Sequence, residues 1–222
     1  MKKLVMIGNS YTFYYKMPEE ILLPLLEEAG WEVSLCCLTK GGQFLLNSAN
    51  PEDVLGVKVK EALEGEHFDY AIIQEQSTCA VLTPEKFYRG VNAILERIRP
   101  TGAKTYLYST WGRKEGSPFL EAHQLSANAM TSLLVAVQEK GARDAGIQGV
   151  FVGKPFEYLT QVCPEIELYQ EDKSHPSYEG SFLAGLCLAA ALTGKDPKDF
   201  KFCGTLSPQI ASVLKEAASM AL

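Results

Sequence analysis

The sequence predicts an α/β protein, a three-layer α/β/α sandwich built around a five-stranded parallel sheet. Two observations support this fold class. Five short apolar runs are spread along the 222 residues, and a segment with helical character follows each of them. Parallel strands need crossover connections, and right-handed crossovers cover the sheet with helices. The commonest arrangement of this size is the flavodoxin-like strand order 2-1-3-4-5, which we expect here.

The strand predictions rest on short runs that are partly β-branched or aromatic and that end at glycine or at polar residues. Lys3-Leu4-Val5-Met6-Ile7, closed by Gly8, is the clearest of them. Because no internal repeat or linker divides the chain, we expect a single domain, 1–222. The strands are expected at 3–8, 31–38, 69–73, 104–108 and 149–153.

The helix predictions rest on apolar spacing and on start and stop signals. Pro18 suits a first helical position, the two glutamates after it suit the positive end of the helix dipole, and Gly30 closes that helix. Pro24 is expected to kink it. The helices are expected at 18–29, 51–63, 84–98, 120–144, 176–193 and 208–222, and a helical turn is expected at 154–161.

Composition excludes several function classes. The formal net charge of −6 and the pI near 5.2 argue against nucleic acid or an anionic membrane as the main partner. No apolar stretch reaches the roughly 18 residues that a membrane span requires. The apolar run near the N-terminus is too short for a signal peptide, so we expect a cytoplasmic protein, although a secreted protein without its leader would look the same.

The six cysteines are scattered, which suggests free thiols more than a disulfide framework in a domain of this size. No CxxC occurs, and the three histidines, at 67, 123 and 175, lie far from any cysteine pair. We therefore expect no metal site.

Ser10 lies where the first predicted strand passes into the first predicted helix. Ligands of open α/β sheets bind outside this carboxyl edge of the sheet. A serine at this position can be a phosphate-loop hydroxyl, a helix cap or a nucleophile, and Gly8-Asn9-Ser10 alone does not decide among them.

Asp172 and His175 form a DxxH segment just before the helix predicted at 176–193. An aspartate three residues before a histidine in a turn can accept the imidazole Nδ1–H, which fixes the tautomer and stabilises the imidazolium. The loop follows the fifth strand, so His175 and Ser10 are expected on the same rim. By itself such a pair is more often a surface or capping contact.

Taken together, these blocks resemble the SGNH, or GDSL-type, hydrolases, which are three-layer α/β/α esterases and lipases. Gly8-Asn9-Ser10 is similar to the first family block, with Asn in place of Asp; Gly41-Gly42 is similar to the glycine block after the second strand. Asp172 and His175 match the last block, DxxH. The resemblance spans almost the whole chain and is greatest to a divergent bacterial branch with a GNSxT first block.

The third family block is GxND, whose Asn helps to bind the oxyanion. This chain has Gln74-Glu75-Gln76-Ser77 instead; Gln76 falls on the Asn position, and Gln74 is the alternative donor. The resemblance implies a serine esterase with the triad Ser10, His175 and Asp172 and no cofactor. It implies an oxyanion hole formed by Ser10, Gly42 and Gln76, where a glycine would let the backbone approach the substrate.

The substrate is expected to be a small ester, and an O-acyl group on a carbohydrate is one candidate. Tyr11, after the serine, and Trp111, in a polar loop after the fourth strand, are the expected substrate-binding residues. The alternatives are a degenerate hydrolase fold kept for sugar binding and a flavodoxin-like module that binds phosphate at the Ser10–Thr12 turn. The oligomeric state is left open by the sequence.

Overall fold

A computed structural model of the protein describes all residues, 1–222. Its centre is a five-stranded sheet in which every neighbouring pair is parallel and the order is β2-β1-β3-β4-β5. The predicted fold class and strand order are therefore confirmed. The strands are β1 (Lys2–Gly8), β2 (Val33–Thr39), β3 (Tyr70–Ile73), β4 (Lys104–Ser109) and β5 (Gln148–Phe151).

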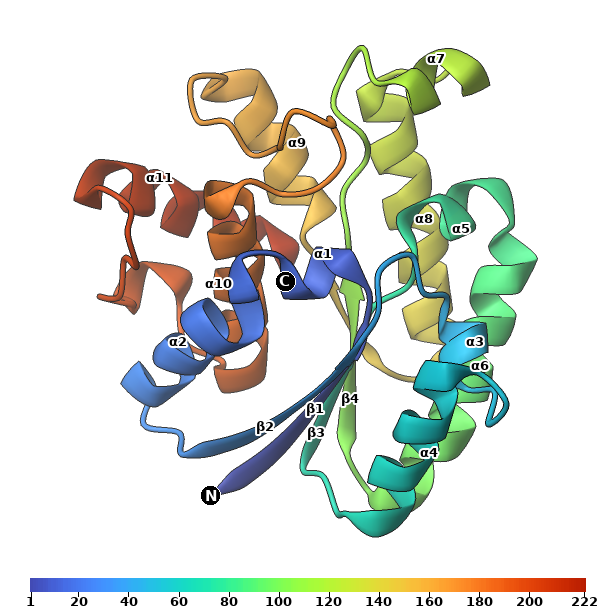
Figure 1. Cartoon of the computed structure of the whole chain (residues 1–222). Helices are drawn as coiled ribbons and strands as arrows, with labels where there is room; N and C mark the ends of the chain where they lie inside the picture. The colour runs from blue at the N-terminus through green and yellow to red at the C-terminus, as the bar shows by residue number, and fades with distance from the viewer.

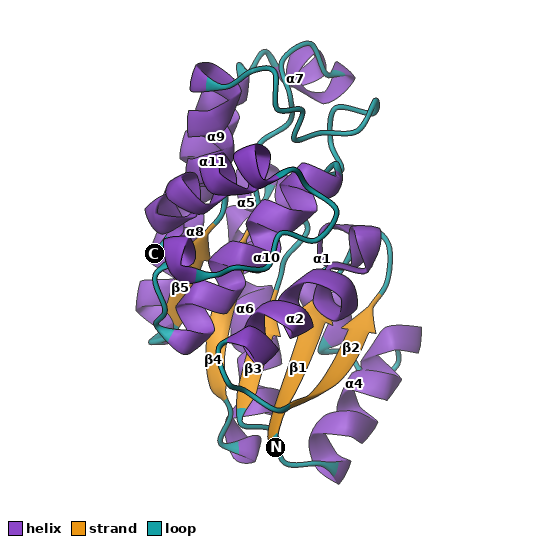
Figure 2. Ribbon diagram, turned by 90° about the vertical axis from the view of Figure 1, so that its left-hand side faces the viewer, coloured by secondary structure: helices purple, strands orange, loops and turns teal.

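Successive residues of the strands face opposite layers, as the pleat requires. In β1, Leu4 and Met6 belong to one buried cluster, whereas Val5 and Ile7 belong to the other. Figure 1 shows the two helical layers on the left and on the right of the sheet. Figure 2, turned by 90°, shows α2 and α10 in front of the strands.

One helical layer packs on the Leu4 face and the other on the Val5 face. The helices on the Leu4 face are α2 (Leu23–Glu28), α9 (Gly153–Val162), α10 (Tyr178–Thr193) and α11 (Pro208–Ala218). Those on the Val5 face are α3 (Leu45–Ser48), α4 (Val54–Gly65), α5 (Ser77–Leu82), α6 (Pro84–Ile98), α7 (Pro118–His123) and α8 (Ala127–Ala145). A one-turn helix, α1 (Ser10–Phe13), and the short η1 (Tyr14–Lys16), η2 (Met17–Leu22), η3 (Arg99–Thr101), η4 (Pro197–Asp199) and η5 (Ser219–Ala221) complete the chain.

Predicted helix boundaries agree with the structure where the sequence carries both a start signal and a regular apolar stripe. The range 84–98 is reproduced by α6, whose apolar face, from Phe87 to Ile98, is buried. The helix α10 starts one residue after Ser177, whose hydroxyl oxygen accepts the Gly180 N–H at 3.0 Å. Such an N-cap satisfies a backbone donor that the helix itself leaves free.

Two predicted helices have a different form. The range 18–29 begins as a π-helix, η2, and becomes α-helical at Leu23, so Pro24 lies in the first turn of α2 and does not interrupt a continuous helix. The range 120–144 consists of two helices. Gln124 adopts φ +53° after α7, and the Ser126 hydroxyl accepts the Ala129 N–H to start α8.

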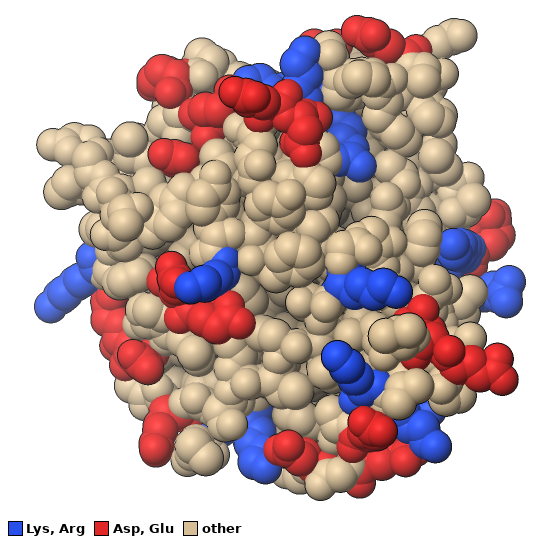
Figure 3. Space-filling model, in the orientation of Figure 1, with Lys and Arg blue, Asp and Glu red and all other residues tan.

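None of the helices combines the length and the hydrophobicity that crossing a bilayer requires. On the face shown in Figure 3, basic and acidic side chains are mixed and no broad basic surface forms. All six cysteines are free thiols, and two of them, Cys79 and Cys187, are buried.

Candidate active site

Ser10 is the first residue of α1, and a single residue, Asn9, separates it from the end of β1. The Asn9 side-chain oxygen accepts the Tyr11 N–H at 3.2 Å and thereby caps the short helix. Because the turn follows the last residue of β1 and the neighbouring strands are parallel to β1, Ser10 lies at the carboxyl edge of the sheet. Ser10 is 9% exposed and lines a pocket at this edge.

The turn before Ser10 is fixed by a buried amide. The Gln74 side-chain oxygen accepts the Asn9 N–H at 2.9 Å and the Thr12 hydroxyl at 3.0 Å. Gly8 is required because a Cβ there would lie 2.8 Å from that oxygen and 2.6 Å from Thr12 Oγ1. The Gln74 amide nitrogen donates to the Glu75 carbonyl oxygen, and Gln74 does not line the pocket that contains Ser10.

The loop of the DxxH segment is built around the Asp172 carboxylate. One carboxylate oxygen accepts the backbone N–H groups of Ser174, at 3.0 Å, and His175, at 2.9 Å. Lys173 adopts φ +58°, a conformation that a non-glycine residue rarely takes. This turn explains the DxxH spacing, because it brings the Asp172 carboxylate back to His175, three positions later.

The hydroxyl of Ser10 and the ring of His175 meet, although 165 residues separate them in sequence. Ser10 Oγ lies 2.9 Å from His175 Nε2, and His175 Nδ1 lies 2.5 Å from Asp172 Oδ2. The Tyr14 ring stacks on the imidazole with centroids 4.4 Å apart, which fixes the plane of the ring. The three side chains thus form one continuous line of hydrogen bonds.

The charge of Asp172 is favoured by this arrangement. Partial burial acts to raise the pKa of Asp172, but hydrogen bonds from the His175 ring and from the backbone N–H groups of His175 and Ser174 outweigh it. The net result is a pKa below the usual value for an aspartate. An ionised carboxylate on Nδ1 leaves Nε2 as the nitrogen that can take a proton from a hydroxyl.

Two backbone N–H groups beside Ser10 have no partner in the protein. The Ser10 N–H belongs to the first residue of α1, where a helix provides no acceptor. Gly42 adopts φ +68° in a turn closed by the Gln43 N–H on the Lys40 oxygen at 3.1 Å, and the Gly42 N–H makes no hydrogen bond within the chain. A Cβ at Gly42 would meet nothing within 4 Å, so the turn's φ angle, and not crowding by the protein, requires glycine here.

Gln76 lines the same pocket and also caps a helix. Its side-chain oxygen accepts the Cys79 N–H at 3.0 Å and the Thr78 hydroxyl at 2.6 Å, which starts α5. With the oxygen occupied, the amide nitrogen is the free end of this side chain. Of the two candidate glutamines, Gln76 lines the pocket and Gln74 does not.

Glu75 connects the two loops that carry Gly42 and Gln76. Its carboxylate oxygens accept the Leu45 N–H at 3.1 and 3.2 Å and the Gln76 N–H at 2.7 Å. The side chain is buried, and burial raises the pKa of Glu75 to about 7 despite these hydrogen bonds. Its pattern in the sequence, a polar residue after a strand, does not distinguish it from a surface carboxylate.

No family model matches the sequence, and no curated protein sequence matches it. Among solved structures, the chain is similar to a candidate SGNH hydrolase from Slackia heliotrinireducens, with 30% sequence identity and a TM-score of 0.76. The match covers 86% of this chain and 98% of that protein.

The chain belongs to the SGNH hydrolases.

Two further structures share the fold of this SGNH hydrolase at lower identity. A DUF4886 family protein from Bacteroides uniformis is 18% identical with a TM-score of 0.79, and the match covers 99% of this chain and 94% of that one. The acetyl xylan esterase AlAXEase is 15% identical with a TM-score of 0.59, and the match covers 86% of this chain and 99% of that one. These two likenesses concern the fold alone.

The two expected substrate-binding aromatics of the SGNH hydrolase differ in position. Tyr11 lines the pocket, but its hydroxyl is held by the Ser174 hydroxyl at 2.9 Å and by an Arg113 guanidinium N–H at 2.6 Å. The prediction for Trp111 is wrong, because this side chain is fully buried. It stacks on Phe156 with centroids 3.9 Å apart and donates its indole N–H to the Ser174 oxygen, so it supports the loop of His175 from inside.

The pocket of the SGNH hydrolase has a volume of about 190 Å³. Its lining includes Arg113 and Ser174, which no sequence pattern indicated. Both residues lie in loops, and the sequence around them does not predict the path of these loops. The lining residues are Asn9, Ser10, Tyr11, Gly42, Gln76, Arg113, Ser174 and His175.

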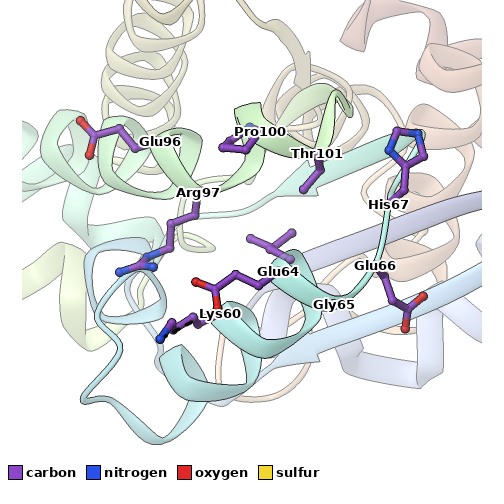
Figure 4. A pocket seen from close by; sticks show the side chains of 10 residues that line it. Lys60, Glu64, Gly65, Glu66, His67, Glu96, Arg97, Pro100 and Thr101 are labelled. Carbon is purple, nitrogen blue, oxygen red and sulfur yellow. Dashed lines mark ion pairs between the residues drawn. The ribbon is translucent and has the colours of Figure 1, made fainter.

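A larger hollow, of about 590 Å³, lies at the opposite edge of the sheet, near the ends of α4 and α6 and before β3 and β4 begin. Figure 4 shows its side chains, among which Lys60, Glu96 and Arg97 extend in different directions. It contains no serine or cysteine, and its histidine, His67, is exposed. Nowhere in the protein do three His, Cys, Asp or Glu side chains gather as they would around a metal ion.

Proposed function

We propose that this SGNH hydrolase is a serine esterase that cleaves a small ester through Ser10, His175 and Asp172. The observation that carries the proposal is the 2.9 Å contact between Ser10 Oγ and His175 Nε2, with Asp172 bound to the other ring nitrogen at 2.5 Å. A serine hydroxyl is a poor nucleophile unless a base removes its proton, and this geometry provides the base and its orienting carboxylate.

In the first half-reaction, Ser10 Oγ attacks the ester carbonyl carbon while His175 Nε2 takes the hydroxyl proton. The carbonyl oxygen becomes an oxyanion in the tetrahedral intermediate. Collapse of the intermediate breaks the bond to the alcohol oxygen, and the imidazolium gives its proton to that leaving oxygen. Ser10 then carries the acyl group, and His175 is neutral again.

The oxyanion would be stabilised by the free N–H groups of Ser10 and Gly42 and by the Gln76 amide nitrogen. Each of these donors belongs to a residue that lines the pocket beside the nucleophile. A single donor of this kind typically lowers the barrier by about 3–4 kcal/mol. In the second half-reaction, His175 takes a proton from water, the hydroxide attacks the acyl carbon, and the acid leaves as Ser10 Oγ recovers its proton.

The part of the substrate that enters the pocket is small, because the pocket has a volume of about 190 Å³ and holds only a short group. An O-acyl group on a carbohydrate is one substrate that suits this site. Phe13, at the end of α1, and Tyr15, in η1, are 38% and 44% exposed and would offer rings for a sugar outside the pocket.

The decisive test is covalent labelling together with turnover. We expect a fluorophosphonate probe to label Ser10 in the wild type, and we expect Ser10→Ala to lose both labelling and hydrolysis of 4-nitrophenyl acetate. Ser219→Ala, which removes an exposed hydroxyl near the C-terminus, is the matched control and should keep both. Undiminished turnover in Ser10→Ala would exclude the proposal.

A further inference from the structure

Arg113 brings the only lysine or arginine side chain to the pocket. It lies in the loop after β4, and it lines the pocket together with Ser10 and His175. None of the eight lining residues is an aspartate or a glutamate. The pocket therefore has a permanent positive charge close to the nucleophile and no negative charge on its own wall.

The guanidinium of Arg113 has few hydrogen-bond partners in the protein and no ion-pair partner. It makes a single hydrogen bond, from one terminal nitrogen to the Tyr11 hydroxyl at 2.6 Å. Its Nε is buried without any partner. None of the nine ion pairs in the molecule includes Arg113, although the chain has 27 Asp and Glu residues. A guanidinium stays charged in a protein, and a partly buried charge without an anion is unfavourable.

The position of this charge is nevertheless fixed. The Tyr11 and Phe119 rings both lie beside the guanidinium, each with its centroid 5.8 Å from Arg113 Cζ. Tyr11 is in turn held by the Ser174 hydroxyl. Asp172, the acidic residue of the site, is engaged by His175 and by two backbone N–H groups, so it forms no pair with Arg113. A rigid, unneutralised guanidinium is ready for an anion from outside.

We propose that the substrate carries a carboxylate, which Arg113 binds while the ester carbonyl lies at Ser10. This inference rests on the proposed esterase function and specifies its substrate class. A guanidinium matches a carboxylate with two parallel N–H···O bonds. A single arginine in a pocket of about 190 Å³ suits a monoanion, whereas no other cation of the lining would neutralise the second charge of a phosphate.

The test compares esters that differ only in this charge. Monomethyl succinate and methyl succinamate place a carboxylate or its neutral amide on the acyl side; acetoxyacetate and acetoxyacetamide place them on the alcohol side. We expect kcat/KM for the carboxylate to exceed that for the amide by roughly 10- to 100-fold in at least one pair, because a hydrogen-bonded charge contributes about that much. A ratio near one in both pairs would overturn the inference.

Variants assign the preference to Arg113. Arg113→Gln should bring the ratio close to one, and Arg113→Lys, which keeps the charge without the planar fork, should give an intermediate ratio. Lys114→Gln, the matched control, removes one positive charge outside the pocket, where Lys114 pairs with Glu167, and should keep the wild-type ratio. A preference that survives in folded Arg113→Gln would contradict the inference, as would stronger inhibition by inorganic phosphate than by propionate, a monoanion.

A failure of the proposed esterase function can be distinguished from a failure of the carboxylate inference. If the wild type hydrolyses none of the four esters, calorimetric titration of Ser10→Ala with monomethyl succinate and methyl succinamate tests the binding alone. Tighter binding of the carboxylate that is lost in Ser10→Ala/Arg113→Gln supports the inference without the esterase. Equal or absent binding of the two compounds overturns it.

Discussion

The Asn9 side-chain nitrogen lies 3.1 Å from the Gln43 backbone oxygen and donates a hydrogen bond to it. This contact joins the turn before Ser10 to the loop that carries Gly42. The same asparagine accepts the Tyr11 N–H through its oxygen, so both ends of the amide are used in a side chain that is 1% exposed. An aspartate could accept the Tyr11 N–H, but when ionised it could not donate to Gln43.

Asn9→Asp should therefore destabilise the protein at neutral pH. A buried carboxylate facing a carbonyl oxygen loses one hydrogen bond, and we expect a loss of about 2–3 kcal/mol in the free energy of unfolding. A protonated aspartate can donate again, so the loss should shrink at acidic pH. Urea unfolding of variant and wild type at pH 8 and pH 5 measures this, and an equal loss at both pH values would contradict it.

The carboxylate of Glu75 should make stability fall as the pH rises. Burial raises its pKa from 4.5 to about 7, so the folded state holds the proton more tightly than the unfolded state does. Stability due to this group is complete below pH 4.5 and is lost as the pH passes 7; the shift corresponds to about 3 kcal/mol.

Glu75→Gln should remove this dependence. The free energy of unfolding of the wild type minus that of Glu75→Gln should drop by about 3 kcal/mol between pH 4 and pH 8.5. Glu85→Gln, which removes an exposed carboxylate of α6, is the control and should keep the wild-type dependence. A constant difference across the range would refute the assignment to Glu75.

Gly42→Ala should lower both stability and turnover through the backbone alone. An alanine at φ +68° costs about 1 kcal/mol, and relief of that strain would move the Gly42 N–H away from the oxyanion. Gly41→Ala is a close control, because a Cβ there also meets nothing within 4 Å and Gly41 has no positive φ. Thermal unfolding and kcat/KM for 4-nitrophenyl acetate should separate the two variants; if they behave alike, Gly42 has no special role.

Asp172→Asn should reduce kcat on the order of 10³- to 10⁴-fold, because an amide no longer fixes the tautomer of His175. The lowered pKa of Asp172 adds a second expectation: its stabilising charge is present above pH 3.8 and is lost as the pH falls below it. Glu171→Gln removes the exposed neighbouring carboxylate and should keep wild-type kcat. Steady-state kinetics of the two variants measure this difference in kcat. A comparable kcat for both would refute the role of Asp172 in orienting His175.

The sequence was sufficient to predict which segments lie near one another. Strand ends determine the rim of a parallel sheet, so Ser10 after β1 and His175 after β5 could be placed on the same rim from the order of the strands. Trp111 also follows a strand, but packing of α9 and of the His175 loop over it decided its burial. No local pattern indicates such long-range coverage.

The positions of two long side chains, Arg113 and Glu75, could not be predicted from the sequence either. The Arg113 guanidinium donates to the Tyr11 hydroxyl at the pocket, and the buried Glu75 carboxylate accepts the Leu45 N–H at the start of α3. Each contact joins residues 30 or more positions apart. Periodicity and turn signals describe neighbours in sequence, so they contain no information on these contacts.

The separation of 165 residues between Ser10 and His175 has a consequence for biosynthesis. A ribosome-bound chain that has exposed only its first 160 residues can pair β1 with its neighbouring strands, yet it lacks the base. Ester cleavage would thus begin only once the chain has been made as far as His175 and this residue has docked beside Ser10. Turnover during translation would report docking of His175 on Ser10, and fragments that end before His175 would be inert.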